Sequence, residues 1–282
     1  MSTKKINDIV VKKINVPKVD PSLILGYEMI PELYANIFIC SRKKTGKTTL
    51  VYNILKNCAN KDTKVIFFVG TIHKDATYKE IKNKLKNKDI EFKEYDSIVD
   101  DNGVDQLEKL VTKLKSEHID DEENEKENEK RPCFIAPYDE DHICIHEDDN
   151  EVKITVKKRK PIKMSPKYII VVDDMSSDIV KNKNLHHLVR QNRHYLTKII
   201  VSSQYLHDLP PEALDQVDVF ILLGGHRKEK LEKIYAHSDA VIEKEKFLEL
   251  YHNATSEPHN FFFIDKNNGK YRKNFNEEYI IT

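Results

Sequence analysis

The chain has 282 residues, of which 39% are hydrophobic and 33% charged, and its formal net charge is zero. This length fits one large domain or two small ones with a sizeable core. The balanced charge excludes a global basic field, so DNA binding would depend on local clusters or on several subunits that line a channel. The sequence has no apolar run long enough for a membrane span and no signal-peptide core. Its four cysteines lack metal spacing, which predicts reduced, intracellular thiols.

The first predicted elements are an arm of extended chain over residues 1–30 and a short buried strand over 37–40. A loop that ends in Gly46, Lys47 and Thr48 follows, and the apolar residues after it have helical spacing. Strand, loop and helix in this order are the context of a P-loop, in which backbone N–H groups at the helix start face phosphate oxygens. Lys47 would contact the β and γ phosphates, and Thr48 would place its hydroxyl on Mg²⁺.

The loop departs from the pattern G-x-x-x-x-G-K-[ST] at Ser41, which stands in place of the first glycine. Glycine costs least strain at this tight exit from the strand, so the sequence leaves the shape of the loop open. A chance Gly-Lys-Thr on a basic loop is the alternative interpretation. The nucleotide-binding residues that the motif predicts are Ser41, Arg42, Lys43, Lys44, Thr45, Gly46, Lys47, Thr48 and Thr49.

A second buried strand is predicted over 64–69, and amphipathic helices over 76–88 and 103–118. A short extended piece around Phe92 lies between the two helices. The domain that follows the arm is predicted to span 31–282.

Residues 117–163 are predicted to be an insertion in this domain. The charge run 120–130 has no apolar residue, which indicates a solvated or mobile loop. Alternating residues over 143–146 and 152–156 indicate a β-hairpin, which ends in the basic cluster 157–160. That cluster contacts DNA phosphates or is an exposed stem balanced by acidic neighbours, and the sequence leaves both interpretations open.

The second motif is an apolar run over 168–172 that ends in Asp173 and Asp174. Such a run predicts a central parallel strand with carboxylates at its C-terminal end, the Walker B pattern. Asp173 would hold Mg²⁺, directly or through water, and Asp174 would orient and polarise the attacking water. Surface acids that cap the next helix are the alternative, and the upstream P-loop pattern favours Walker B.

The last third of the chain alternates helices and strands. The predicted elements are helix 180–193, strand 198–204, helix 210–216, strand 218–224, helices 227–236 and 241–252, and strands 260–265 and 270–275. One strand lies between the two motifs, and the strand after Walker B ends in Gln204. This succession is that of P-loop ATPases with an additional carboxylate beside Walker B, in which Gln204 would lie near the γ-phosphate and sense it.

The expected fold is α/β, a three-layer αβα P-loop NTPase of RecA/ASCE type. Its mostly parallel sheet would have the order 5-1-4-3-2, with an inserted β-hairpin and a C-terminal strand pair.

The segments 41–49, 169–175 and 192–211 resemble those of the poxvirus-type genome-packaging ATPases of large double-stranded DNA viruses and virophages. These enzymes belong to the FtsK–HerA superfamily of P-loop ATPases. The spacing from Arg193 to Gln204 is similar to that between the family's intersubunit arginine and its sensor glutamine. The resemblance covers most of the domain and departs from the family at the first loop glycine and in the insertion.

The resemblance implies an ATP- and Mg²⁺-dependent double-stranded DNA translocase, a pentameric or hexameric homo-oligomer ring that pumps a viral genome into a capsid. It also implies capsid vertex proteins as partners, and a place in the host cytoplasm, the viral factory or the virion. Arg193 would be a finger for the neighbouring subunit's site, with Arg190 as its substitute, and a cap on its own helix is the alternative. The sequence leaves two other functions open: a nucleotide or nucleoside kinase, and a nucleotide-binding structural protein with a P-loop weakened at Ser41.

Overall fold

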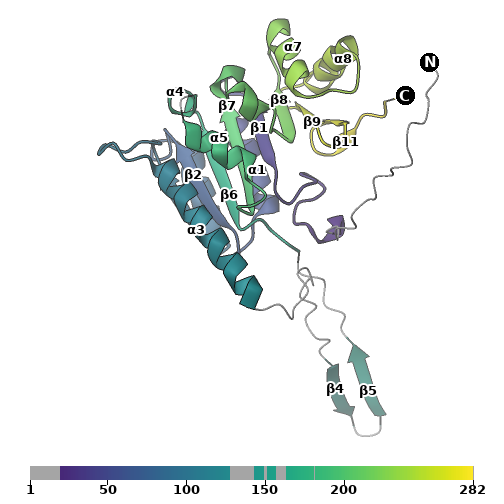
Figure 1. The fold of residues 1–282 in the computed structure, drawn as a ribbon. Coiled ribbons are helices and arrows are strands. Elements are labelled where there is room, and N and C mark those ends of the chain that lie inside the picture. Colours follow the sequence, from purple (N-terminus) through teal and green to yellow (C-terminus); the bar gives the residue numbers. More distant parts are fainter. Residues whose placement is uncertain (1–19, 128–142, 149–150, 157–162, 181, 282) are drawn as a thin grey trace, which may run out of the picture.

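The structure, a computed structural model, describes residues 20–127, 143–148, 151–156, 163–180 and 182–281. Its centre is a nine-stranded sheet with helices on both faces (Figure 1). Figure 1 shows α3 beside β2 at one end of the sheet, and α7 and α8 beside β9 at the other. Among the helices of the described residues, none combines the length and the apolar character that a bilayer span requires.

The sheet is parallel over most of its width. Its strands are β1 (Asn36–Cys40), β2 (Lys64–Val69), β3 (Phe92–Tyr95), β6 (Tyr168–Asp173), β7 (Thr197–Ser203), β8 (Val219–Leu223), β9 (Phe261–Asp265), β10 (Lys270–Lys273) and β11 (Glu277–Glu278). Their order is β11-β10-β9-β8-β1-β7-β6-β2-β3. The strands from β8 to β3 are paired in parallel, and β9, β10 and β11 are antiparallel additions. Strands β8-β1-β7-β6-β2 have the predicted order 5-1-4-3-2, so the predicted fold class is confirmed.

Two further predictions concern the edges and the insertion. The C-terminal strand pair is β9 and β10, and β3 adds an edge strand where the sequence indicated only an extended piece. The predicted hairpin is present as β4 (Ile143–Asp148) and β5 (Glu151–Val156), which form a separate antiparallel pair. The basic cluster 157–160 lies outside the described residues.

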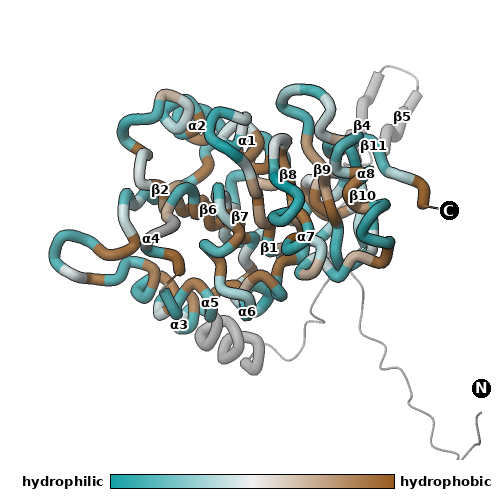
Figure 2. The backbone as a smooth tube through the Cα atoms, turned by 90° about the horizontal axis from the view of Figure 1, so that it is seen from above, coloured by the Kyte–Doolittle hydropathy of each residue, from teal (hydrophilic) through white to brown (hydrophobic). Residues whose placement is uncertain are grey.

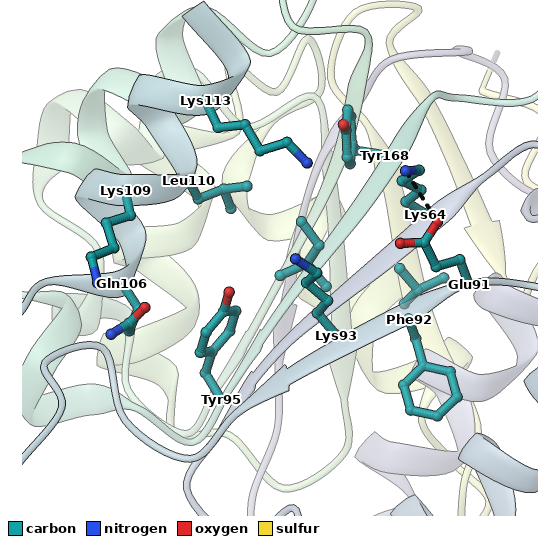
Figure 3. A pocket seen from close by; sticks show the side chains of 12 residues that line it. Lys64, Glu91, Phe92, Lys93, Tyr95, Gln106, Lys109, Leu110, Lys113 and Tyr168 are labelled. Atoms are coloured by element: carbon teal, nitrogen blue, oxygen red, sulfur yellow. Dashed lines mark ion pairs between the residues drawn. The ribbon is translucent and has the colours of Figure 1, made fainter. Parts of the chain in front are cut away.

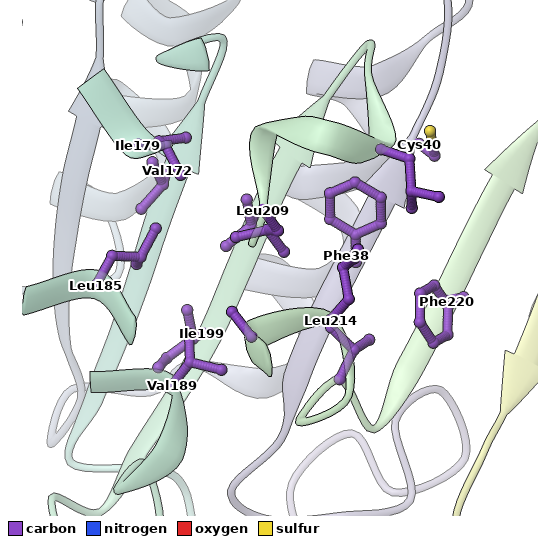
Figure 4. Packing of buried hydrophobic residues seen from close by; sticks show 14 of the residues in the cluster. Phe38, Cys40, Val172, Ile179, Leu185, Val189, Ile199, Leu209, Leu214 and Phe220 are labelled. Carbon is purple, nitrogen blue, oxygen red and sulfur yellow. The ribbon is translucent and has the colours of Figure 1, made fainter. Parts of the chain in front are cut away.

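The central strands are buried along their whole length. Continuous apolar runs of this kind are typical of parallel strands that are covered on both faces. On one face, Phe38 of β1 and Phe220 of β8 meet edge to face, with ring centroids 6.2 Å apart (Figure 4). Cys40 and Cys58 are buried free thiols that pack as small apolar side chains. Figure 2 shows the brown, hydrophobic segments along the central strands and teal, hydrophilic segments in the outer loops.

Helices of the described residues cover the two faces unequally. They are α1 (Lys47–Cys58), α2 (Ala76–Lys86), α3 (Gln106–Glu127), α4 (Ser176–Ile179), α5 (Lys183–Arg190), α6 (Pro211–Leu214), α7 (Lys228–His237) and α8 (Lys244–Ala254), with 3-10 turns η1 (Pro21–Leu23) and η2 (Leu206–Asp208). The buried side chains of α1 and α2 belong to one core cluster, and those of α3 to α8 belong to the other. The core is therefore formed by two layers of side chains on either side of the sheet.

The acidic run differs from its prediction. The helix expected over 103–118 continues to Glu127, so residues 120–127 are helical where the sequence predicted a loop. Glu and Lys have high intrinsic helix propensity, and an existing helix is extended more easily than a new one is started. A charge run without apolar residues is therefore compatible with helix when it follows an anchored amphipathic segment.

The predicted N-terminal arm lies partly outside the described residues, which begin at Asp20. Its described end is not simply extended, because η1 forms there with Asp20 as its cap, whose side chain accepts a hydrogen bond from the Ser22 N–H at 2.9 Å. Ile24 pairs with Met164 in an isolated parallel bridge, and Ile30 is fully buried. These contacts attach the segment to the domain.

Candidate nucleotide-binding and catalytic site

The loop between β1 and α1 carries the P-loop pattern. Gly46 caps α1 with a φ of 100°, a left-handed conformation that favours glycine. Lys44 also has a positive φ, of 63°, and the hydroxyl of Thr45 donates to the Arg42 carbonyl at 2.8 Å. Glycine offers no capping side chain, so the N–H groups in the first turn of α1 remain available to phosphate oxygens.

Ser41 is buried where the chain leaves β1. Its N–H donates to the Ser203 carbonyl at 3.1 Å, which extends the pairing of β1 with β7 by one residue. Ser41 does not have a positive φ, so serine here meets no left-handed strain. The departure from the glycine pattern is compatible with a loop that delivers Gly46 and Lys47 to the start of α1.

Lys47 meets both predicted carboxylates. Its Nζ lies 3.1 Å from Asp173 Oδ1 and 2.5 Å from Asp174 Oδ1. Asp173 ends β6, and Asp174 follows it with a positive φ of 52° and a side chain that is 41% exposed. The parallel strands β1 and β6 end at the same edge of the sheet, which brings these three side chains together from distant parts of the chain.

Asp173 is buried and has a third partner, Tyr78 of α2. The Tyr78 hydroxyl donates to Asp173 Oδ2 at 2.7 Å. Burial raises the pKa of Asp173 above its ordinary value, while the charge of Lys47 and the hydrogen bond from Tyr78 act in the opposite direction. Burial also raises the pKa of Tyr78 well above its ordinary value, so this hydroxyl remains a donor. Tyr78 thereby fixes the carboxylate plane and leaves Oδ1 directed at Lys47.

Gln204 lies at the same edge, directly after β7. Its side-chain amide donates to Asp174 Oδ1 at 3.4 Å. Lys230 of α7 donates to the backbone carbonyl of Gln204. Because β7 lies between β1 and β6, the predicted proximity of Gln204 to Asp174 follows from the order of the sheet.

The residues predicted to hold Mg²⁺ fit that ion by their chemistry. Thr48, next to Lys47 in the first turn of α1, offers a hydroxyl, and Asp173 offers a carboxylate. Magnesium prefers oxygen ligands and is held by one or two carboxylates together with substrate phosphates. The side chains present therefore supply the few oxygen ligands that a protein gives to Mg²⁺, and the phosphates of the nucleotide would supply others.

Arg193 is far from this cluster in the same chain. Its Nη2 lies 3.3 Å from Glu32 Oε2 and 3.7 Å from Asp218 Oδ1, and its side chain is 65% exposed. It precedes β7, whereas Gln204 follows β7, and a strand of this length spans about 20 Å at ~3.3 Å per residue. Arg190 ends α5 and is also exposed. The structure therefore does not bring either arginine to the P-loop of its own subunit.

Two histidines beside the P-loop were not singled out in the sequence. His226, in the loop between β8 and α7, bonds through Nε2 to the Cys40 carbonyl at 3.0 Å. Burial and the charge of Lys230 lower the pKa of His226 to about 4, so the ring is neutral and Nε2 carries its proton. His259 Nδ1 lies 3.3 Å from the Thr45 carbonyl oxygen. Neither histidine stands in a motif, and only the packing of the loops after β8 and α8 brings them to the P-loop.

Comparisons with known proteins give a likeness of fold. No family model matches the sequence, and no curated protein matches it. Among solved structures, the chain is similar to the genome-packaging NTPase B204 from Sulfolobus turreted icosahedral virus 2 in complex with ATP-gammaS. The two are 16% identical with a TM-score of 0.49, over 84% of this chain and 95% of that chain. It is similar to B204, the DNA-packaging ATPase from Sulfolobus turreted icosahedral virus, at 16% identity and a TM-score of 0.49, over 86% and 97% of the two chains.

A third similar structure is the pCW3 conjugation coupling protein TcpA with ATPgS. It is 13% identical with a TM-score of 0.45, over 82% of this chain and 57% of that chain. At these identities and TM-scores, the likeness extends to no residue of the site.

Proposed function

We propose that the protein is an Mg²⁺-dependent ATPase that translocates double-stranded DNA and serves as a viral genome-packaging motor. The observation that carries this proposal is the meeting of Lys47, Asp173, Asp174 and Gln204 at one edge of a parallel sheet. The proposed assembly is a ring of five or six copies that works with capsid vertex proteins. Its proposed place is the host cytoplasm or viral factory, or the virion.

ATP binding uses the loop and the start of α1. Backbone N–H groups of the first turn bind the β and γ phosphates, and Lys47 exchanges its contacts with Asp173 and Asp174 for phosphate oxygens. Thr48 and Asp173 would hold the metal ion. When bound, the ion neutralises charge on the phosphate oxygens. Tyr78 keeps the Asp173 carboxylate oriented and accessible to it.

Hydrolysis depends on the more exposed carboxylate. Once Lys47 binds phosphate, Asp174 is free to accept a proton from the attacking water and to orient that water. Gln204, whose amide contacts Asp174, is placed to respond to the γ-phosphate and to pass its presence or loss to β7. Solvent reaches Asp174, whose side chain is 41% exposed, so the attacking water can come from bulk solvent.

Arg193 supports a shared site. It is exposed, lies at the opposite end of β7 from Gln204, and pairs with carboxylates and not with carbonyls of its own helix. A cation in this position is available to the γ-phosphate of a neighbouring subunit, where it would stabilise transition-state charge. This arrangement makes assembly a condition for activity.

The proposed function is tested with two variants of the acidic pair. Asp174→Asn should bind Mg-ATP with an affinity close to that of the wild type but hydrolyse it slowly, whereas Asp173→Asn should lose Mg²⁺-dependent binding. Binding is measured by nucleotide titration with and without Mg²⁺, and hydrolysis by phosphate release without an acceptor and with or without double-stranded DNA. Equal loss of Mg-ATP binding in both variants would contradict the division of roles. ADP formation only in the presence of a nucleoside acceptor, with the phosphoryl group recovered on the acceptor and no phosphate released, would indicate a kinase.

A further inference from the structure

A groove with a volume of 630 Å³ lies beside the proposed catalytic site and has no role in the mechanism above. Its floor is apolar and is formed by η2 and α6, with Leu206, Leu209 and Leu214 among the lining residues. One wall is formed by the start and exposed side of α7.

The rim of the groove is basic. Arg227, Lys230 and Lys233 line it with one carboxylate, Glu229, so three positive charges face one negative charge for a net of +2. These cations recur every third residue and lie along one side of α7. Arg227 and Lys233 are exposed, and neither has an ion-pair partner among the described residues. A surface of this kind is complementary to a polyanion.

The groove also carries an exposed aromatic pair. Tyr205 is 54% exposed, and its ring stacks on His207 with centroids 5.2 Å apart and an interplanar angle of 30°. The Tyr205 N–H donates to the Ser203 hydroxyl at 3.1 Å, which anchors the backbone beneath the ring. Phenolic hydroxyls, like arginine and lysine, are regular donors to phosphate and sugar oxygens of duplex DNA.

The groove is continuous with the proposed sensor. Tyr205 directly follows Gln204, and Lys230 of the groove wall donates to the Gln204 carbonyl. Whatever occupies the groove therefore contacts the segment that holds Gln204, whose side-chain amide donates to Asp174.

We propose that this groove binds the sugar–phosphate backbone of double-stranded DNA, and that this contact stimulates hydrolysis through the segment carrying Gln204. The proposal rests on the proposed function. Arg227 and Lys233 are six positions apart, about 9 Å along α7 at ~1.5 Å per residue. This distance is roughly two to three nucleotide steps of one strand at ~3.4 Å each. Contacts of this kind position DNA without reading its sequence.

A second basic pocket of the described residues provides a matched control. It has a volume of 200 Å³ and lies between β3 and α3 (Figure 3), with Lys93 and Lys109 on its rim. Both lysines are exposed and have no ion-pair partner among the described residues, whereas Lys64 in the same pocket pairs with Glu91 at 3.0 Å. None of the residues that line this pocket is next to Gln204. A variant of this pocket therefore shows the effect of losing two positive charges without losing the proposed DNA contact.

The test compares DNA affinity across salt concentrations for the wild type, Arg227→Ala/Lys233→Ala and Lys93→Ala/Lys109→Ala. Each phosphate contact contributes about −0.9 to the slope of log K against log salt, so the groove variant should have a slope about 1.8 less steep. The control variant should keep the wild-type slope. In a second measurement, Tyr205→Ala should lose most of the DNA stimulation of phosphate release and keep the DNA-independent rate.

The outcomes separate the two proposals. Absence of double-stranded DNA binding by the wild-type protein would overturn the proposed function itself. If the wild type binds DNA and Arg227→Ala/Lys233→Ala keeps the wild-type salt slope, the groove proposal alone is overturned. The groove proposal is also overturned if Lys93→Ala/Lys109→Ala changes the slope as much as Arg227→Ala/Lys233→Ala does. Full DNA stimulation in Tyr205→Ala would remove the link to Gln204. Melting temperatures identify any variant that is unfolded. If Arg227→Ala/Lys233→Ala is unfolded, the slope of DNA affinity against salt is measured instead with the single variant Lys233→Glu.

Discussion

The hydrogen bond from Tyr78 to Asp173 gives a sharp test of the proposed Mg²⁺ site. Tyr78→Phe removes one hydroxyl and keeps the ring, which packs edge to face on Phe67 with centroids 5.8 Å apart. Hydrogen bonds to charged groups contribute about 1.5–3 kcal/mol, and loss of a partner that orients a metal ligand costs about 10–100-fold in affinity or activity. We therefore expect the Mg²⁺ concentration for half-maximal hydrolysis to rise about 10–100-fold.

The same change has a pH signature. Burial already raises the pKa of Asp173, and Tyr78 opposes this by stabilising the carboxylate, so its loss raises that pKa further. Mg²⁺ needs the ionised carboxylate, so Mg²⁺ binding is lost as pH falls through this pKa, and the acidic limb of activity should move to higher pH in the variant. Tyr279→Phe, which loses a 2.7 Å hydrogen bond to Asn253, is the control. Wild-type Mg²⁺ and pH dependence in a folded Tyr78→Phe protein would refute the orienting role.

Two further predictions concern the cations. Lys47→Ala should weaken ATP binding and reduce phosphate release by about 10²-fold or more, since it removes the charge that faces the phosphates; near-normal turnover would exclude the proposed site. Arg193→Ala should bind ATP and assemble but hydrolyse it about 10³–10⁵-fold more slowly. Mixing it with Asp174→Asn should restore activity, because some interfaces then combine an intact Asp174 with an intact Arg193. Phosphate release that stays flat across mixing ratios, with subunit exchange demonstrated, would place Arg193 outside any shared site.

Local patterns were sufficient for the five central strands and for their order. Apolar runs that end in Asp173 or Gln204 mark buried parallel strands, and their succession predicts the order β8-β1-β7-β6-β2 that the structure has, whereas the edge strands β3 and β11 were not predicted. Tyr78 could not be predicted, because in an amphipathic helix it has the spacing of an ordinary core residue and its partner lies 95 positions away. The same holds for His226, which meets Cys40 only after β8 is placed beside β1.

The acidic run shows a second limit of sequence reasoning. Composition indicates that residues 120–127 have no apolar face to bury, and this is compatible with solvated helix as well as with loop. The choice depends on the anchored first half of α3, where Leu107, Leu110 and Leu114 are buried. The position of Arg193 could not be predicted from local sequence either, because its distance from the P-loop depends on the length and direction of β7.

The borders of the sheet limit how copies of the protein associate. Over the described residues, the sheet ends on one side in β11, which has two residues, Glu277 and Glu278, and on the other in β3, which has four and includes Lys93 and Glu94. Short, charged border strands are poor templates for a strand from another molecule. Neighbouring copies are therefore expected to meet through helices and loops, with no hydrogen-bonded ladder from one to the next. Contacts of that kind can slide and reform, which suits the proposed ring, whose subunits would shift against each other in each cycle of nucleotide turnover.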